Sequence, residues 1–138
     1  MNLSLEYIAG FFDGEGHVSI TEMHRRNTID PKLVVRLTNT FLPVLDYIKG
    51  VYGGTIYKQP KVKSHYLQVY VLSLTVEQSK KFLTDILPFL VIKKEQAEEA
   101  LKFSRTVYRR GKKNVSDEEK EIRMECMDKL WRLKRQEF

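Results

Sequence analysis

The stretch Ile8–Gly16, with the sequence IAGFFDGEG, decides the fold that this chain is expected to adopt. It overlaps a predicted short helix over residues 4–13, whose apolar residues recur at helical spacing: Leu5, Ile8 and Phe12. Ser4 can cap the start of this helix by accepting a hydrogen bond from a backbone N–H. Gly14 and Gly16 are expected to end the helix, because glycine permits an abrupt turn.

Glu15 lies between those two glycines, at the C-terminal end of the predicted helix. The helix dipole is negative there, so a carboxylate is unfavourable unless a cation lies close by. Hard divalent metal ions prefer carboxylate and backbone carbonyl oxygens as ligands. The stretch therefore indicates a metal-binding acid, on a helix whose small residues Ala9 and Gly10 would let a second backbone approach. A surface acid at a glycine turn is the alternative.

Outward from this stretch, pairs of predicted strands alternate with helices. Strands are expected over 17–24, 32–39, 55–59 and 65–73, and helices over 42–51, 76–87, 94–108 and about 116–133. This order favours a mostly antiparallel sheet with helices on one face and polar residues on the other. The fold class is therefore α+β, and a length of 138 residues suits a single domain over 1–138.

The charge of the chain is unevenly distributed. The net charge is +6, from 24 Lys and Arg against 18 Asp and Glu. Residues 1–16 contain three acids and no base, whereas residues 17–70 contain eight bases and three acids, a net charge of +5. A basic surface attracts nucleic acid, because bound phosphates release condensed counterions. The single cysteine, Cys126, excludes an intramolecular disulfide, and no apolar run is long enough to span a membrane.

The stretch Ile8–Gly16 resembles the motif of the LAGLIDADG homing endonucleases. That motif reads Leu-Ala-Gly, two apolar residues, Asp, a small residue, Asp or Glu, and Gly, and only Ile8 departs from it, conservatively. Asn39 and the segment LPFLVIKKEQA over 87–97, with its Lys93, extend the resemblance to about residues 4–108. It implies the αββαββα homing-endonuclease fold, whose antiparallel sheet forms a DNA-binding saddle, followed by a C-terminal helical extension over 109–138.

Because the chain carries one copy of the motif, the resemblance implies a homodimer rather than a pseudo-symmetric monomer. The motif helices of the two subunits would pack side by side through Ile8, Ala9, Gly10, Phe12 and Asp13. Each subunit would deliver Glu15, with the Gly14 carbonyl as a further ligand, to divalent ions at the dimer centre. Mg²⁺ is the expected cofactor, with Mn²⁺ as a substitute, for two-metal phosphodiester hydrolysis.

The resemblance also implies catalytic roles for two other residues. Lys93 would lie near the attacking water or the transition-state phosphate, where a cation stabilises developing charge. Asn39 would belong to the solvent network that positions this water. Each has a structural alternative, with Lys93 as an ordinary surface lysine and Asn39 as the cap of the turn before the next helix.

The outward-facing rows of the predicted strands supply the expected DNA contacts. Arg and Lys suit guanine in the major groove, and Gln suits adenine. Lys61, Lys63 and the basic run 109–113 suit phosphates, although that run could equally be a solvated hinge. For Tyr57 and Tyr70 the alternative is cross-strand packing. The expected DNA-binding residues are His17, Ser19, Thr21, Met23, Lys32, Val34, Arg36, Thr38, Thr55, Tyr57, Gln59, Lys61, Lys63, Gln68 and Tyr70.

Three functions are weighed for these residues. The first is a site-specific homing endonuclease that uses divalent metal, as a homodimer, to cut a long, near-palindromic double-stranded DNA. The second is a non-cleaving binder on the same scaffold, either an RNA maturase that holds intron RNA or a transcription-factor-like protein; the presence of Glu15 favours the first. The third is a basic structural module whose glycines only build a turn, which leaves the basic strands unexplained. An intracellular location is expected, in an organelle or with a microbial or phage-encoded element, and no membrane partner.

Overall fold

In the part of the chain that the structure describes, a four-stranded antiparallel sheet with the order β1-β2-β4-β3 carries five α-helices. The computed structural model describes residues 1–25, 28–106 and 117–135, and for 22–25 and 28–30 only the backbone. The strands are β1 (Gly16–Arg25), β2 (Thr28–Asn39), β3 (Thr55–Lys58) and β4 (Tyr70–Leu74). The helices are α1 (Leu5–Glu15), α2 (Leu42–Tyr52), α3 (Val76–Ile86), α4 (Lys94–Ser104) and α5 (Asp117–Lys134), with a 3₁₀ turn, η1 (Leu87–Phe89). The predicted α+β class and αββαββα order are confirmed.

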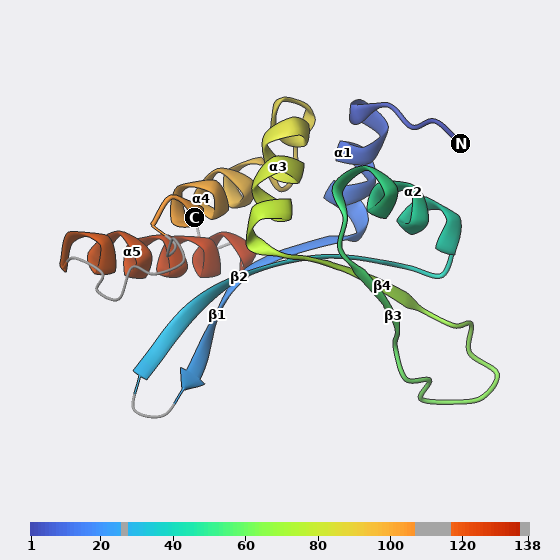
Figure 1. Ribbon diagram of the computed structural model, residues 1–138, viewed down its shortest axis with the longest axis horizontal. Helices are drawn as coiled ribbons and strands as arrows, with labels where there is room; N and C mark the ends of the chain where they lie inside the picture. The colour runs from blue at the N-terminus through green and yellow to red at the C-terminus, as the bar shows by residue number, and fades with distance from the viewer. Residues whose placement is uncertain (26–27, 107–116, 136–138) are drawn as a thin grey trace.

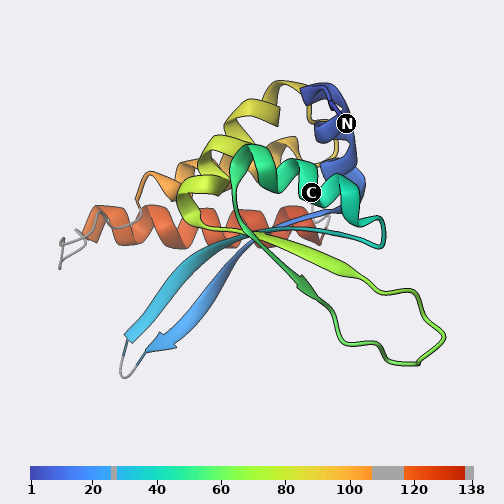
Figure 2. The ribbon, with the colours of Figure 1, turned by 45° about the vertical axis from the view of Figure 1, so that its right-hand side comes forward.

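The helices lie on one side of the sheet, and two hairpins diverge on the other side like the legs of an arch (Figure 1, Figure 2). The hairpin β1–β2 forms one leg and the hairpin β3–β4 forms the other. They are joined where β2 pairs with β4, from Val35 opposite Leu74 to Asn39 opposite Tyr70. The sheet therefore presents an outer face, between the two legs, that no described helix covers. None of the described helices is long and apolar enough to cross a membrane.

The core lies between the helices and the inner face of the sheet. Alternate strand residues point inward, as the two-residue period of a strand requires. Phe82 of α3 is fully buried, and its ring meets Phe12 of α1 and Tyr52 of α2 edge-to-face, at centroid distances of 5.4 and 5.1 Å. The Tyr52 hydroxyl donates to Asp85 Oδ2 at 2.8 Å, which joins α2 to α3. Burial, followed by this bond, raises the pKa of Tyr52.

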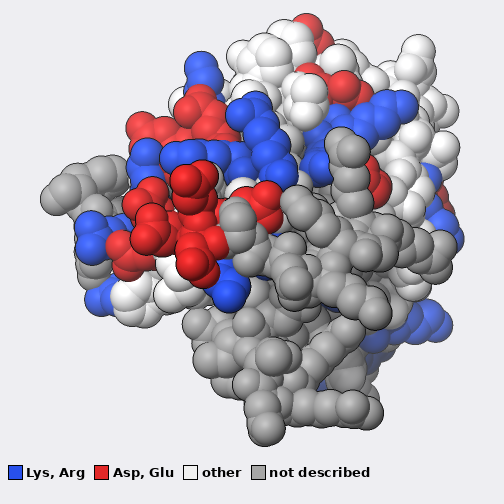
Figure 3. Space-filling view, turned by 60° about the vertical axis from the view of Figure 1, so that its left-hand side comes forward, with Lys and Arg blue, Asp and Glu red and all other residues white. Residues whose placement is uncertain are grey.

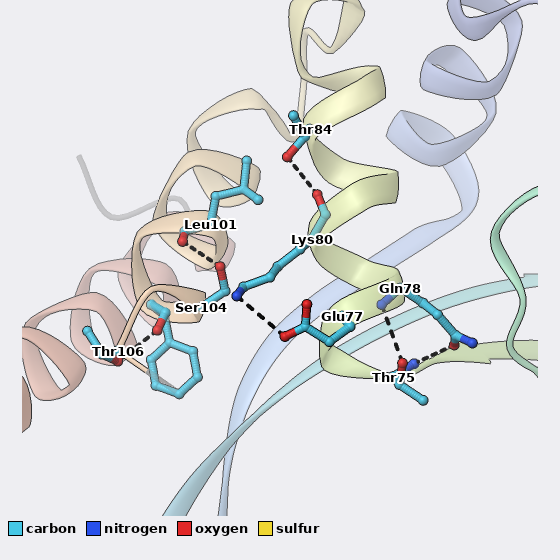
Figure 4. A network of polar contacts seen from close by, with 9 residues as sticks. Thr75, Glu77, Gln78, Lys80, Thr84, Leu101, Ser104 and Thr106 are labelled. Atoms are coloured by element: carbon cyan, nitrogen blue, oxygen red, sulfur yellow. Dashed lines mark hydrogen bonds and ion pairs between the residues drawn. The ribbon is translucent and has the colours of Figure 1, made fainter. Parts of the chain in front are cut away.

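Local hydrogen bonds fix where α3 begins and where α4 ends (Figure 4). The N–H of Gln78 donates to Thr75 Oγ1 at 3.3 Å, and the N–H of Thr75 donates to Gln78 Oε1 at 2.9 Å. This reciprocal capping box satisfies two backbone donors that a helix start would otherwise leave free. The hydroxyls of Ser104 and Thr106 each donate to the carbonyl three residues earlier, at 2.6 and 2.7 Å. The helix α4 therefore ends at Ser104 rather than at the predicted residue 108.

The C-terminal helix α5 is attached to α4 through polar contacts. Buried Arg123 donates to the hydroxyl of Thr106 at 3.2 Å and to its carbonyl. Lys129 forms an ion pair with Glu99 of α4 at 3.0 Å. The view that faces this flank shows acidic and basic side chains intermingled (Figure 3). Cys126 is buried beneath them, and burial, with Glu99 close by, raises the pKa of its thiol to about 11.

The predicted boundaries of α1 and β4 were also wrong. The helix α1 runs through Gly14 and ends at Glu15, so Gly14 does not stop it. Gly16 caps the end of α1 in an extended conformation, with φ of −83°. A side chain does not fit at this position, because a Cβ there would collide with the ring of Phe12. The strand β4 covers only Tyr70–Leu74 rather than 65–73, because the hairpin beyond Tyr70 extends past the helices and is mostly exposed.

Gly54, in the turn that enters β3, is expected to be intolerant of any side chain. Its φ is +107°, and a Cβ there would lie 2.8 Å from Leu74 Cδ2 and from the carbonyl oxygen of Ser73. We expect Gly54→Ala to lower the free energy of unfolding by about 2 kcal/mol, because backbone strain and the clash add. Urea denaturation measures this change.

Gly50 offers a matched control, because it is exposed within α2 and a Cβ there would meet nothing within 4 Å. Gly50→Ala should stabilise the protein, by up to about 1 kcal/mol from helix propensity. Similar effects of the two substitutions would contradict the assignment of strain to Gly54.

Candidate nucleic-acid interface and metal site

The carboxylate of Asp13 joins the end of α1 to the segment that follows η1. Asp13 is 9% exposed, and its Oδ2 and Oδ1 accept hydrogen bonds from the backbone N–H groups of Val91 and Lys93, both at 2.9 Å. The ammonium of Lys93 donates to the backbone carbonyl of Asp13 at 2.6 Å. Three hydrogen bonds, two of them to a carboxylate, therefore hold Lys93 against the last turn of α1.

Glu15 lies in the same last turn and points away from the core. Its side chain is exposed, and it has no hydrogen bond or ion pair within the part of the chain that the structure describes. Gly14 beside it is also exposed, and its carbonyl is a second oxygen donor on the same turn. Among the described residues, no group of three or more His, Cys, Asp and Glu could hold a metal ion. Hard oxygen donors at this turn fit a divalent ion, but one chain supplies too few of them.

Three basic side chains gather around His17, at the start of β1. Burial lowers the pKa of His17, and the positive charges of Lys134, Arg36 and Lys93 lower it further. Lys134, from the last turn of α5, places its Nζ 3.3 Å from His17 Nδ1. The sequence analysis missed Lys134, because it lies 117 residues from His17 in a helix with interleaved charges, where no local pattern marks it.

A groove of about 440 Å³ opens on the outer face of the sheet, next to this cluster. The groove is lined by five of the expected DNA-binding residues: His17, Arg36, Thr38, Tyr57 and Gln59. Val71, which was not expected, completes the lining. Their side chains combine donors, acceptors, one aromatic ring and a guanidinium. Such a set can read base edges in a major groove.

The strand register confirms the outward orientation of the expected rows on β1, β2 and β3. Residues that pair across antiparallel strands lie on the same face, and His17 pairs with Arg36. The same face carries the pairs Ser19–Val34, Thr21–Lys32, Thr38–Val71, Thr55–Ser73 and Tyr57–Val71. Val34 is nevertheless buried beneath its neighbours. Lys61 and Lys63 are exposed between β3 and β4, whereas the Met23 side chain and the run 109–113 lie outside the described residues.

The expected outward positions of Tyr70 and Gln68 are wrong. Tyr70 pairs with Asn39 and Lys58 and packs against the core, so the outward residues of β4 are Val71 and Ser73. Apolar residues on both faces of β4 hide the two-residue alternation in its sequence. Gln68 instead donates through Nε2 to the backbone carbonyls of Gln59, at 2.8 Å, and Val69, at 3.0 Å. The bond to Gln59 links the two sides of the hairpin.

Four of the five residues expected at a dimer interface face the core of their own chain. Ile8, Ala9 and Phe12 are at most 2% exposed, and Asp13 is occupied by its bonds to the segment after η1. Only Gly10 is exposed. One stripe along α1 is instead exposed, formed by residues spaced three and four apart: Tyr7, Gly10 and Gly14. Phe11, beside this stripe, is partly buried against the core.

Asn39 has a structural task in this chain. Its Oδ1 accepts a hydrogen bond from the backbone N–H of Phe41 at 2.8 Å, two residues later. This bond shapes the turn that enters α2, so the capping alternative is confirmed. A catalytic role for Asn39 stays a prediction.

Comparison with known proteins gives one family and one fold. A sequence profile described as LAGLIDADG endonuclease matches residues 8–105. No curated protein sequence matches significantly. The archaeal intron-encoded homing endonuclease I-Vdi141I, solved with DNA, shares 20% identity at a TM-score of 0.72, over 94% of this chain and 82% of its own. The homing endonuclease I-TnaI shares 19% at a TM-score of 0.69, over 98% and 96%.

A third solved structure is of a longer chain. I-SmaMI, bound to an uncleaved DNA target in the presence of calcium ions, shares 18% identity at a TM-score of 0.72, over 94% of this chain but only 45% of its own. At these identities the likeness shows the fold. The present chain therefore matches about half of I-SmaMI and nearly all of I-TnaI.

The bonds of Asp13 predict a specific sensitivity of the fold. In Asp13→Asn one carboxylate oxygen becomes an NH₂ group that faces a backbone N–H, so a buried donor loses its acceptor. We expect the free energy of unfolding to fall by about 2 kcal/mol. The control is Asp46→Asn, which changes an exposed acid on α2 and should leave stability within about 0.5 kcal/mol. Equal stability of both variants in urea would contradict the structural role of Asp13.

Proposed function

Because this chain belongs to the LAGLIDADG endonuclease family, we propose that it is a site-specific DNA endonuclease that works as a homodimer with divalent metal ions. The observation that carries the proposal is the exposed carboxylate of Glu15, free of partners among the described residues, at the end of α1 and two residues before His17, which lines the groove. An exposed carboxylate that forms no ion pair is available to a metal ion.

The outer face of the sheet is the proposed DNA surface. A two-stranded β-ribbon fits the major groove, and each subunit offers two such ribbons. Arg36, Tyr57 and Gln59 line the groove between them and are placed to read base edges. Exposed Lys32, Lys61 and Lys63 are placed for phosphates, which fix the position of the protein without specifying sequence. The solved complexes of I-Vdi141I and I-SmaMI with DNA support this use of the fold.

The proposed reaction centre lies at the end of α1. Glu15 and the Gly14 carbonyl would hold divalent ions, which, when bound, supply an activated water and charge neutralisation for the leaving oxygen. Mg²⁺ is the proposed ion, and the calcium ions present with I-SmaMI support a divalent site in the family. Lys93, fixed by its bonds to Asp13, presents a cation to the developing negative charge of the phosphate. A pre-positioned cation stabilises charge without reorganising.

A homodimer completes this centre. One chain offers a single Glu15, and no described trio of ligands surrounds it. The stripe of Tyr7, Gly10 and Gly14 is exposed on α1, and a Cβ at either glycine would meet nothing within 4 Å. Two such stripes, packed about a two-fold axis, would bring the two α1 ends together. This chain matches about half of the longer I-SmaMI chain, which supports a functional unit of two such chains.

Glu15→Gln tests the metal role. We expect cleavage to fall by about a hundredfold or more, since the amide is a poor metal ligand, while DNA binding persists. The assay presents a randomised duplex library with Mg²⁺, with Mn²⁺ and with EDTA, and sequences the cut ends. The control Glu6→Gln changes an exposed acid at the opposite end of α1 and should cleave normally. Normal cleavage by Glu15→Gln would refute the metal assignment, and a wild type that binds without cutting would favour the non-cleaving alternative.

Gly10→Leu tests the dimer. The free chain has room for this side chain, so the variant should fold with near-normal thermal stability. At the proposed interface the same side chain would separate the two helices, and we expect the dissociation constant of the dimer to rise by about tenfold or more. Gly50→Leu is the matched control, with equal open space on α2. Sedimentation velocity should give dimers for the wild type and Gly50→Leu; dimers of unchanged affinity for Gly10→Leu would place the interface elsewhere.

A further inference from the structure

The helix α5 carries one basic side chain to the proposed reaction centre. Lys134 lies in its last turn, with Nζ 3.3 Å from His17 Nδ1 at the start of β1. Its stem lines a hollow of about 610 Å³ between α5 and β1, together with Leu130 and Trp131. Burial and the nearby charge of Lys93 lower the pKa of Lys134, so the two ammonium groups lie within electrostatic reach of each other.

Two basic residues of α5 lie in ion pairs, in contrast to Lys134. Lys129 has the carboxylate of Glu99 at 3.0 Å, and Arg132 has that of Asp128 at 3.1 Å. Lys134 has no carboxylate partner among the described residues. Nor do Lys93 and Arg36, the other two permanent cations near His17, within the same described part of the chain.

Cations that the fold brings together without a counter-charge destabilise the free protein, because like charges repel. A bound polyanion offsets this repulsion, because its phosphates attract each of the cations. A lysine that served only the dipole at the C-terminal end of α5 would need no such neighbours. The convergence of Lys134, Lys93 and Arg36 therefore points to an anion rather than to helix stability.

We propose that Lys134 is a phosphate-binding residue of the DNA site, contributed by α5 from outside the αββαββα core. Its ammonium binds a phosphate of the DNA backbone at the edge of β1, beside the phosphate that faces Lys93. The proposal rests on DNA binding as part of the proposed function. It gives α5 a task in substrate binding, for which its packing on α4 and β1 supplies the rigidity.

The experiment measures how the affinity of the intact protein for duplex DNA of arbitrary sequence depends on salt, in EDTA so that nothing is cut. Loss of one phosphate contact lowers the slope of log K against log [salt] by about 0.9, so a dimer that lacks both lysines should lose about 1.8. Lys134→Met keeps an unbranched stem at the hollow and removes the charge. Lys134→Arg keeps the charge and should restore the slope.

Lys120→Met is the matched control, because Lys120 is exposed near the start of the same helix. It should keep the wild-type slope. If Lys134→Met does not fold by circular dichroism, Lys134→Gln takes its place. An unchanged slope for the Lys134 variant would overturn the proposal, and so would an equal loss in Lys120→Met, which would mean that only net charge matters.

The same titrations separate this proposal from the nuclease itself. A wild type that binds duplex DNA in EDTA but never cuts it with Mg²⁺ would refute the proposed activity and leave the slope test of Lys134 intact. A wild type that cuts DNA while Lys134→Met retains the full slope would refute only the role of Lys134.

Discussion

The carboxylate of Asp13 is the constraint on which the site depends. It accepts two backbone N–H groups from the segment after η1, and the ammonium of Lys93 returns a third bond to the Asp13 carbonyl. A buried carboxylate with two donors stabilises its position strongly, because charge-assisted hydrogen bonds are strong at low dielectric. The same three bonds fix Lys93 beside Glu15, residues that are 78 apart in the chain. Of the two acids of the motif, buried Asp13 thus orders the site, whereas Glu15 is exposed and has no partner among the described residues.

The two sides of the helix α1 have different environments. One side, with Ile8, Ala9 and Phe12, completes the core of its own chain, and the other, with Gly10 and Gly14, remains open. The motif therefore serves folding and proposed assembly at once. Apolar character alone does not tell a core from a subunit contact, so the sequence cannot divide the residues of α1 between the two.

The sheet shows a similar division between its two faces. On β1, β2 and β3 the alternation of apolar and polar residues predicted the outward rows, because one face is buried and the other is open. On β4 the alternation failed, because Val71 is buried on the outer face while Leu72 and Leu74 are buried on the inner one. A shift of one residue turns a whole row to the other side, so Tyr70 joins the core and not the groove.

The sequence by itself determined the α+β class, the order of helices and strands, the family motif with Glu15, and the basic character of the strands that line the groove. These properties depend on local spacing and composition, because helices and strands have fixed periods that place apolar residues on one face. Only the tertiary structure decided which side of α1 is open, which face Tyr70 takes, that Asn39 shapes a turn, and that Lys134 meets His17. Those outcomes depend on contacts between residues far apart in the chain, and such contacts leave no periodic trace in the sequence.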